Sequence, residues 1–395
     1  MTILWPVYLK INHYNLPTGQ CLQANRVKEK NLFAGVKMKN QAPHHKHRGM
    51  SAQNKLLLYK NRQQEIHAPG IQKLKGLICL LIASLLMLPS CTTLPRHPLD
   101  EEQKTFIAEE GEGIFNRHAP VFIVERPEKK YNLIGTPAAR TDKKGEEKIF
   151  VDPGRAAVFY EKRIFETEKG KYTNLFYRVH FKKVPSFNLT AGNNGGLFIA
   201  ITLNEKEEPL LYTTVHTCGC YIAFIPTSFL PREMMPHKWD DKRQIVLGES
   251  LPGILDYKGA FHSSLKTMIL FRDATHRIMD LWLEKTEKVF KRKNSVETKL
   301  IPMKKLEQLP LEKKGTTSFF EHDGPRKGYV KMSHKFWERL LMSWWAFDWR
   351  IGEDKMLGKD KSEGTRFYTS LKPWARDESD MRDFPAFLEY WGWGL

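Results

Sequence analysis

Apolar and polar residues alternate along most of the segments between residues 148 and 285. In residues 176–184, for example, Tyr177, Val179 and Phe181 point one way, and the polar residues Arg178, His180 and Lys182 point the other. Successive side chains of a β-strand point to opposite faces of a sheet, so this period of two predicts half-buried strands. The same alternation occurs in residues 155–165, 196–204, 208–226, 243–248 and 267–285.

The segments between these strands have the composition of tight turns. Residues 166–172, 190–196 and 203–209 read ETEKGKY, TAGNNGG and LNEKEEP, which supply the Gly, Asn and Pro that turns require. No helical pattern intervenes between consecutive strands, which favours an antiparallel sandwich or open barrel over alternating strands and helices. Residues 115–332 are therefore predicted to form a β-rich domain.

The pattern becomes helical after residue 332. Ser333 is placed to cap a helix in SHKFWERLLMSWWAFDW, and a second helix near the end has Asp383 as its expected cap and Pro385 in its first turn. We therefore expect an α+β fold, a mainly antiparallel β sandwich or open barrel with the Trp-rich helices of residues 333–395 packed on the same body. The first helix should pack through the apolar face formed by Trp337, Leu340, Leu341, Trp344 and Trp345.

An apolar segment precedes the predicted folded body. Lys73 and Lys75 are followed by 14 residues, 76–89, that are apolar except for Ser84. A short positive region before such a run is the layout of a secretory signal peptide, which we place at residues 71–90. The run is shorter than the about 20 residues of a membrane span, so a retained anchor and a buried helix are the less favoured alternatives.

The end of this segment reads Leu88-Pro-Ser-Cys91 and resembles the lipobox of bacterial lipoproteins. The resemblance implies that Cys91 receives a lipid such as palmitate, becomes the first residue of the mature protein and inserts into a lipid bilayer. The next residue is Thr92 and not the Asp that often retains such proteins at the inner membrane, so the resemblance implies the periplasmic face of the outer membrane. Residues 91–114 would then form a tether and a short helix.

The residues before the signal peptide carry most of the positive charge. Residues 1–70 are polar, rich in His and Lys and without periodicity, so we predict a disordered presequence that reflects an over-extended gene start. Residues 1–90 contain 13 Lys and Arg and 2 Asp and Glu, which leaves +7 of the formal net charge of +18 for the mature part. This balance predicts no nucleic-acid partner and suits a surface near anionic lipid head groups.

Two cysteines remain once the presequence is removed and Cys91 is lipid-modified. They lie in His216-Thr-Cys218-Gly-Cys220, within the predicted strand of residues 208–226, where alternation puts all three side chains on one mainly apolar face. Three interpretations stay open. The cysteines are buried core thiols beside a hydrogen-bonded histidine, ligands of a metal ion, or a strained disulfide with a role in thiol exchange.

The metal interpretation needs more ligands than this strand supplies. Thiolate and imidazole ligands suit Cu(I) or Zn, so the cofactor would be copper or zinc. One strand provides two or three ligands, and a neighbouring strand must provide the fourth. His276 is the first choice, with His180 and His262 as alternatives. The C-x-C spacing differs from the C-x-x-C knuckle of zinc ribbons.

Further candidates lie in the C-terminal region. Glu353 and Asp354 could serve as paired carboxylates in glycan hydrolysis, although solvated loop charges beside Lys355 are favoured. Trp391 and Trp393 are the candidates for stacking on a glycan, although helical spacing places most tryptophans in the core. The leading prediction is a non-enzymatic envelope lipoprotein that binds an envelope protein or glycan partner or stabilises an assembly. A copper, zinc or thiol-redox protein and a glycan-binding or glycan-hydrolysing protein are the alternatives.

Overall fold

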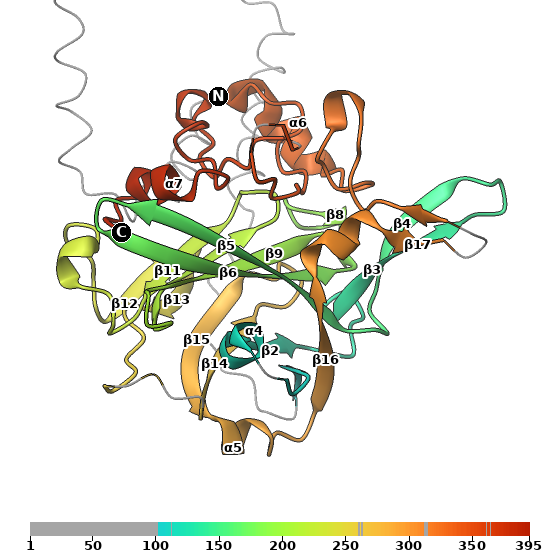
Figure 1. Cartoon of the computed structure of the whole chain (residues 1–395). Helices are drawn as coiled ribbons and strands as arrows, with labels where there is room; N and C mark the ends of the chain where they lie inside the picture. Colours follow the sequence, from blue (N-terminus) through green and yellow to red (C-terminus); the bar gives the residue numbers. More distant parts are fainter. Residues whose placement is uncertain are drawn as a thin grey trace, which may run out of the picture. The chain divides into compact units, whose positions relative to one another are not determined.

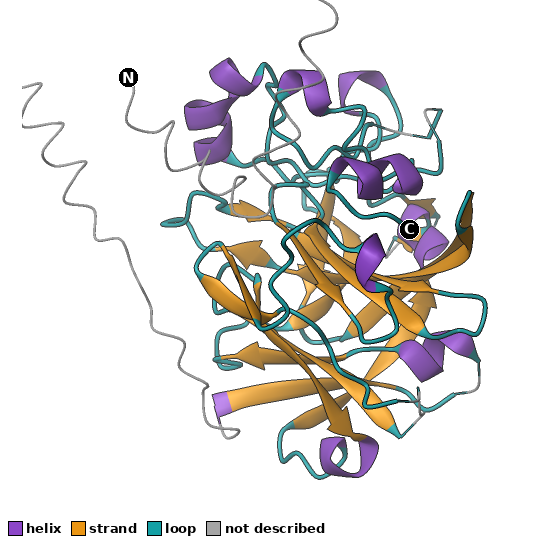
Figure 2. Cartoon of the chain, turned by 90° about the vertical axis from the view of Figure 1, so that its left-hand side faces the viewer, coloured by secondary structure: helices purple, strands orange, loops and turns teal. Residues whose placement is uncertain are grey.

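The structure of the protein, a computed structural model, describes residues 102–111, 113–259, 261, 264–311, 315–360, 362–363 and 365–395. The predicted presequence, the predicted signal peptide, Cys91 and His262 lie outside these residues. The described chain forms a large curled sheet that resembles a half-barrel (Figure 1). Helices α6 (Phe336–Ala346) and α7 (Phe384–Tyr390) belong to a C-terminal region that lies against one side of this sheet (Figures 1 and 2).

Among the described residues, twelve strands form the curled sheet. Its main path runs β11-β10-β9-β6-β5-β16-β1-β2-β14-β15, while β3 pairs with both β6 and β4. The strands are β1 (Gln103–Ala108), β2 (Val121–Glu125), β3 (Ile134–Thr141), β4 (Glu147–Asp152), β5 (Ala157–Thr167), β6 (Gly170–Phe181), β9 (Gly196–Leu203), β10 (Pro209–His216), β11 (Ile222–Pro226), β14 (Leu265–Phe271), β15 (Ile278–Lys285) and β16 (Ser295–Pro302).

Pairing within the sheet is mixed. β1 runs parallel to β16, β2 parallel to β14 and β5 parallel to β16, whereas the other pairs of this sheet are antiparallel. The predicted α+β class with a mainly antiparallel, open barrel-like sheet is therefore confirmed. The predicted short helix before residue 114 is wrong, because residues 103–108 form β1, whose partners β2 and β16 lie further along the chain.

Both faces of the sheet are covered. Tyr177 and Val179 of β6 belong to one core on the side of β2 and β14, whereas Phe176 packs on the other side against Phe384 of α7 with 5.8 Å between ring centroids. Burial on both sides also encloses Arg178 and His180, which the alternation had placed on a half-exposed face. β6 is thus a central strand of the molecule, and polar side chains on it are costly unless they find partners.

The remaining elements are short. Asp383 caps α7, as predicted, and accepts a hydrogen bond from the Ala386 amide at 3.2 Å. Ser333 does not cap α6, because its hydroxyl donates to the Val330 carbonyl at 2.9 Å and the helix begins three residues later. The other helices and strands are α4 (Ile114–His118), α5 (Thr286–Val289), β7 (Lys183–Val184), β8 (Gly192–Asn193), β12 (Arg243–Val246), β13 (Glu249–Pro252), β17 (Leu309–Pro310) and β18 (Thr316–Thr317).

Candidate functional site

The His216-to-Cys220 segment is a hairpin turn and not the middle of a strand. β10 ends at His216, β11 begins at Ile222, and the two strands pair in antiparallel register. The Gly219 amide donates to the His216 carbonyl at 2.7 Å, and Gly219 has φ +83°. A Cβ at this position would overlap the carbonyl of Tyr368, so only glycine lets the turn lie this close to the C-terminal region. The predicted continuous strand over residues 208–226 is wrong for this reason.

Cys218 and Cys220 form a disulfide across this turn, with their α-carbons 5.5 Å apart. Cys218 is buried and Cys220 is half-buried, so the second sulfur is the more accessible one. Of the three interpretations, the structure contains the disulfide. In this oxidation state neither sulfur is a thiolate, which is the form that binds metal.

The ligand atoms of His216, Cys218 and Cys220 lie within 4.8 Å of one another. The His276 ring does not join them. Its Nε2 lies 3.0 Å from the Tyr131 carbonyl, and only its backbone oxygen is near His216 Nε2, at 3.4 Å. The structure therefore does not place His276 as the fourth ligand. Burial lowers the pKa of His216 well below its ordinary value, so this imidazole is neutral near pH 7.

His180, one of the two other histidines proposed as ligands, does not join the group. The His180 ring packs edge-on between Phe159 and Phe319, with 5.2 Å between ring centroids in each pair. Its two nitrogens make no hydrogen bond within the described part of the chain. His262 lies outside the described residues.

Charged residues surround the turn from the C-terminal side and are buried, whereas solvated loop charges were expected. Lys355 is fully buried, and its Nζ donates to the carbonyl oxygens of Cys218 at 2.8 Å and Glu353 at 3.3 Å. Asp354 accepts a short hydrogen bond from Thr217 and lies 3.5 Å from Lys335 Nζ. The turn is thus fixed to the C-terminal region by charge-assisted contacts.

The carboxylates of Glu353 and Asp354 are not paired with each other. Glu353 is 2% exposed and lies 2.5 Å from Arg326 Nη1 and 3.3 Å from His334 Nδ1. Asp354 belongs to the separate group with Thr217 described above. An acid and a base for glycan hydrolysis must both face the bound sugar. Because these carboxylates are buried and occupied by different partners, they do not form such a pair.

Trp391 and Trp393 are core residues. They are 7% and 3% exposed, and both rings pack against Phe224, at 6.1 Å and 5.3 Å between centroids. The Trp391 indole N–H donates to Thr369 at 3.0 Å. Neither ring faces a space where a sugar could stack, so the structure does not support them as ligand-facing residues.

The apolar face of α6 points to solvent, which is the reverse of the predicted packing. The residues that α6 buries include Glu338 and Ser343, together with Met342 and Ala346. Seven large apolar residues on α6 and just after it are 42% to 78% exposed. We call this set the aromatic surface: Phe336, Trp337, Leu340, Leu341, Trp344, Phe347 and Trp349. Trp345 is the one tryptophan of the predicted face that packs inward, against the cluster of Met342 and Ile351.

Comparison of the chain with protein-family models, with curated proteins and with solved structures finds no match. Within the part of the chain that the structure describes, we find no helix with the length and apolar character that a membrane span requires.

Proposed function

We propose that the chain is a non-enzymatic lipoprotein of the bacterial cell envelope, anchored through Cys91 in the outer membrane, that associates with a second copy through its aromatic surface. The observation that supports this proposal is the outward apolar face of α6. Monomeric soluble proteins rarely expose large contiguous apolar patches, and those that do use them for association. The role of the protein is then to form an anchored assembly, with its sheet as a rigid scaffold.

The area of the aromatic surface suits a protein interface. From their exposed fractions, its seven side chains present on the order of 900 Å² to solvent, close to the about 800 Å² that each partner contributes to a standard interface. Phe336, Leu340 and Trp344 are spaced four residues apart along α6. Ridges of this spacing pack against the same ridges of a second helix, as a twofold interface requires.

The position of the anchor argues against the anchor's own bilayer as the occupant. Arg292, three residues after α5, donates to Gln103 at the start of β1 at 2.7 Å, and α5 and α6 lie at opposite ends of the body (Figure 1). A tether from Cys91 to Glu102 spans at most about 40 Å. A compact domain of this size is about 50 Å across, so a tether of this length favours a membrane on the α5 side of the body over contact of α6 with that membrane. Two copies joined end to end can lie flat with both tethers reaching the bilayer.

The hydrogen-bonding groups of the aromatic surface argue against a glycan. Sugar recognition combines ring stacking with hydrogen bonds to hydroxyl groups. Two of the three tryptophans of the surface already use their indole N–H groups: Trp337 donates to the Ser186 carbonyl, and Trp344 donates to the Leu341 carbonyl. The two leucines and two phenylalanines of the surface have no polar side-chain atom. Such a surface is complementary to another apolar surface.

A photo-crosslinking amino acid at position 344 of the full chain, produced in bacteria, tests the association. We expect a crosslinked species of twice the chain mass, which disappears when Leu341→Glu is added. The matched control is Trp374→Glu, at another exposed tryptophan outside α6, which should leave the crosslink intact. Crosslinks to lipid or to a different protein alone would refute self-association. In parallel, Cys91→Ala should abolish labelling with palmitate, and persistent labelling would refute the anchor.

The grouping of His216, Cys218 and Cys220 favours a second candidate function, reversible thiol or metal chemistry. A disulfide that closes a loop of three residues stabilises the fold by only about 1.6 kcal/mol in the chain-entropy model, so it has little value as a structural crosslink. A dithiol reductant can transfer two electrons and two protons to the disulfide, which yields two thiols. On binding one Cu(I) or Zn ion, the two thiols would release their protons to solvent and ligate the ion as thiolates together with the neutral imidazole.

Zinc titration of the full chain, reduced and kept under anaerobic conditions in competition with a chromophoric chelator, tests this candidate. We expect about one equivalent of zinc per chain, lost in His216→Ala and retained in His322→Ala, at an exposed histidine far from the turn in sequence. If thiol counting shows two free thiols in the turn and no zinc binds, the metal candidate is wrong.

A further inference from the structure

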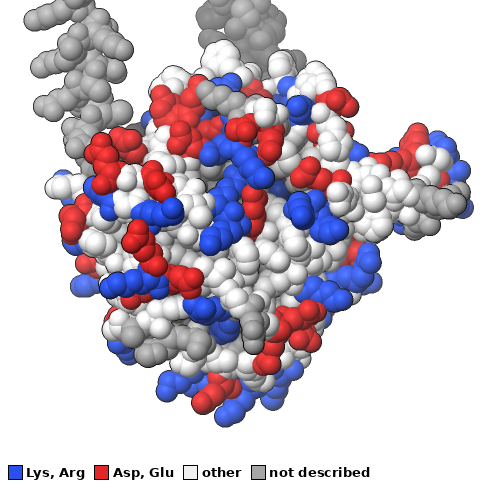
Figure 3. Space-filling model, viewed as in Figure 1, with Lys and Arg blue, Asp and Glu red and all other residues white. Residues whose placement is uncertain are grey.

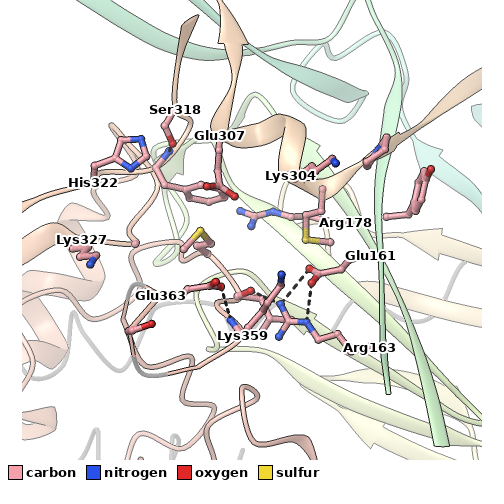
Figure 4. Close-up of a pocket in the computed structure, with 18 of the residues that line it drawn as sticks. Glu161, Arg163, Arg178, Lys304, Glu307, Ser318, His322, Lys327, Lys359 and Glu363 are labelled. Atoms are coloured by element: carbon pink, nitrogen blue, oxygen red, sulfur yellow. Dashed lines mark hydrogen bonds and ion pairs between the residues drawn. The ribbon is translucent and has the colours of Figure 1, made fainter. Parts of the chain in front are cut away.

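A charged pocket lies between the sheet and the C-terminal region, and its lining residues include neither the turn nor the aromatic surface. Its volume is about 530 Å³, within the range of small-molecule sites. One wall is the part of β5 from Tyr160 to Arg163, and a second is the 3₁₀ turn of residues 303–307. Further lining residues come from segments 318–328, 356–360 and 362–363 (Figure 4).

Arg178 of β6 borders this pocket, and its guanidinium points toward the centre (Figure 4). The side chain is fully buried, with its guanidinium 4.9 Å from the Phe198 ring centroid and 5.2 Å from that of Phe320. Nη1 donates to the Lys355 carbonyl at 3.2 Å. Nε and Nη2 make no hydrogen bond within the described part of the chain.

Leaving these N–H groups without an acceptor is expensive. A buried charged donor without a partner costs more than the about 1–3 kcal/mol of a neutral one, so native structures supply an acceptor. Burial lowers the pKa of Arg178 to about 9, with the charge of Asp354 acting in the opposite direction, so the guanidinium stays charged near pH 7. The missing acceptor is therefore expected to carry negative charge.

The rim of the pocket has an excess of positive charge. Four lysines at the rim are exposed and form no ion pair among the described residues: Lys162, Lys304, Lys327 and Lys359. Three of the four lining glutamates already have partners: Glu161 contacts Arg163 at 3.1 Å, Glu321 contacts Arg326 at 3.4 Å and Glu363 accepts from the Lys359 amide at 3.0 Å. Lys and Arg side chains gather on this face below the C-terminal region (Figure 3).

We propose that this pocket binds a small organic anion, whose carboxylate or phosphate group accepts hydrogen bonds from Nε and Nη2 of Arg178. These two N–H groups form one side of the guanidinium fork, which matches the paired oxygens of such a group. Lys327 and Lys359 neutralise a second negative charge at the rim. Apolar contacts from Met303, Phe320 and Met356 hold the carbon skeleton, which distinguishes an organic anion from a simple inorganic ion.

Binding is measured by calorimetry and thermal unfolding of the full chain, with citrate as a carboxylate probe and glucose 6-phosphate as a phosphate probe. Sodium chloride keeps the ionic strength constant, and glucose is the uncharged control. A ligand that binds only the folded state raises the unfolding temperature, so one of the two anions should raise it and glucose should not. The anion that binds more tightly identifies the recognised group.

Two sets of variants test where the anion binds. Lys327→Ala with Lys359→Ala should raise the dissociation constant at least tenfold, and because both side chains are exposed the variant remains folded. The matched control, Lys291→Ala with Lys299→Ala, removes two exposed lysines outside the pocket and should leave the constant unchanged. Arg178→Lys keeps the charge but loses the fork, so it should abolish binding.

Two results would overturn the proposal. One is that neither probe binds to the folded wild type at 10 mM, about ten times a dissociation constant of 1 mM. The other is an equal loss of affinity in the rim variant and its control, which would show binding to the general surface charge. Should Arg178→Lys fail to fold, the comparison of the two lysine pairs still decides the question. Neither result depends on whether the chain self-associates.

Discussion

Buried Lys355 should make the stability of the protein depend on pH in a predictable direction. Burial lowers the pKa of Lys355 from its ordinary value of 10.5 to about 8, against the opposing pull of nearby carboxylates. Between pH 8 and pH 10.5 the unfolded chain therefore holds the proton more tightly than the folded chain does. The free energy of unfolding rises with pH wherever the unfolded state binds more protons. The contribution of Lys355 to this free energy is therefore fully present above pH 10.5, falls as the pH is lowered, and is lost below pH 8.

The size of the effect follows from these two pKa values. Integrating the linkage relation from pH 7 to pH 9 gives a rise in the free energy of unfolding of about 1.3 kcal/mol. Buried tyrosines titrate in the opposite sense, but only nearer pH 10 and above, so the window ends at pH 9. Lys355→Met removes the titrating group and keeps a side chain of similar length. From pH 7 to pH 9, the free energy of unfolding of the wild type should therefore rise by about 1.3 kcal/mol more than that of this variant.

Urea denaturation of both proteins at pH 7, 8 and 9, at constant ionic strength, measures this difference. Lys291→Met is the matched control, because Lys291 is exposed, and its difference from the wild type should not change with pH. A flat difference between wild type and Lys355→Met would show that Lys355 is hydrated in solution. Such a result would refute the two buried contacts of Lys355 Nζ, the hydrogen bond to the Cys218 carbonyl and the position 4.6 Å from the centroid of the Tyr368 ring.

Other predictions concern packing and capping, each measured by urea denaturation. Gly219→Ala should lower the free energy of unfolding by about 2–4 kcal/mol, because alanine is strained at φ +83° and its Cβ overlaps the Tyr368 carbonyl. A decrease below about 1 kcal/mol would contradict the close approach of the turn to Tyr368. Trp391→Ala should lower the free energy of unfolding by about 3–5 kcal/mol, because this tryptophan is buried. Trp374 is 77% exposed, so Trp374→Ala should lower it by less than about 0.5 kcal/mol. Equal decreases would contradict the burial of Trp391. Asp383→Ala should cost about 1 kcal/mol through loss of the α7 cap, and no loss would contradict the capping bond.

The fold class was predictable because its signals are local. A period of two located β5 and β9 within two residues at each end and the second half of β6, and Asp383 with Pro385 located the start of α7. The hairpin of β10 and β11 was missed because the alternation continues through the turn, which depends on the positive φ of a single glycine, Gly219. β1 was missed for a different reason. In its pairing with β16, Thr105 lies opposite Ser295, about 190 residues later, and no local pattern encodes such a parallel pairing.

The sites were harder to predict than the fold. The ligand atoms of His216, Cys218 and Cys220 lie within 4.8 Å of one another, because residues this close along a chain meet in a strand or in a turn. The role of His276 depended on the direction of a side chain, which spacing does not determine. Arg178 was read as one of the outward residues of a half-buried strand. Only the packing of the C-terminal region over β6 shows that it is enclosed and borders a pocket.

Helix α6 packs in the reverse of the orientation that its sequence pattern predicts. Helical periodicity identified the apolar face but not the side on which the body lies, and the usual expectation is that the apolar face is buried. Here the inner face carries Glu338, which lies 3.9 Å from Lys335 Nζ and close to Lys355 and Asp354. A buried ionic group of this kind is a weak source of stability, yet removing one member leaves an uncompensated charge. The ionic group thus holds α6 in one orientation before any partner binds, so a variant that loses self-association should keep α6 folded.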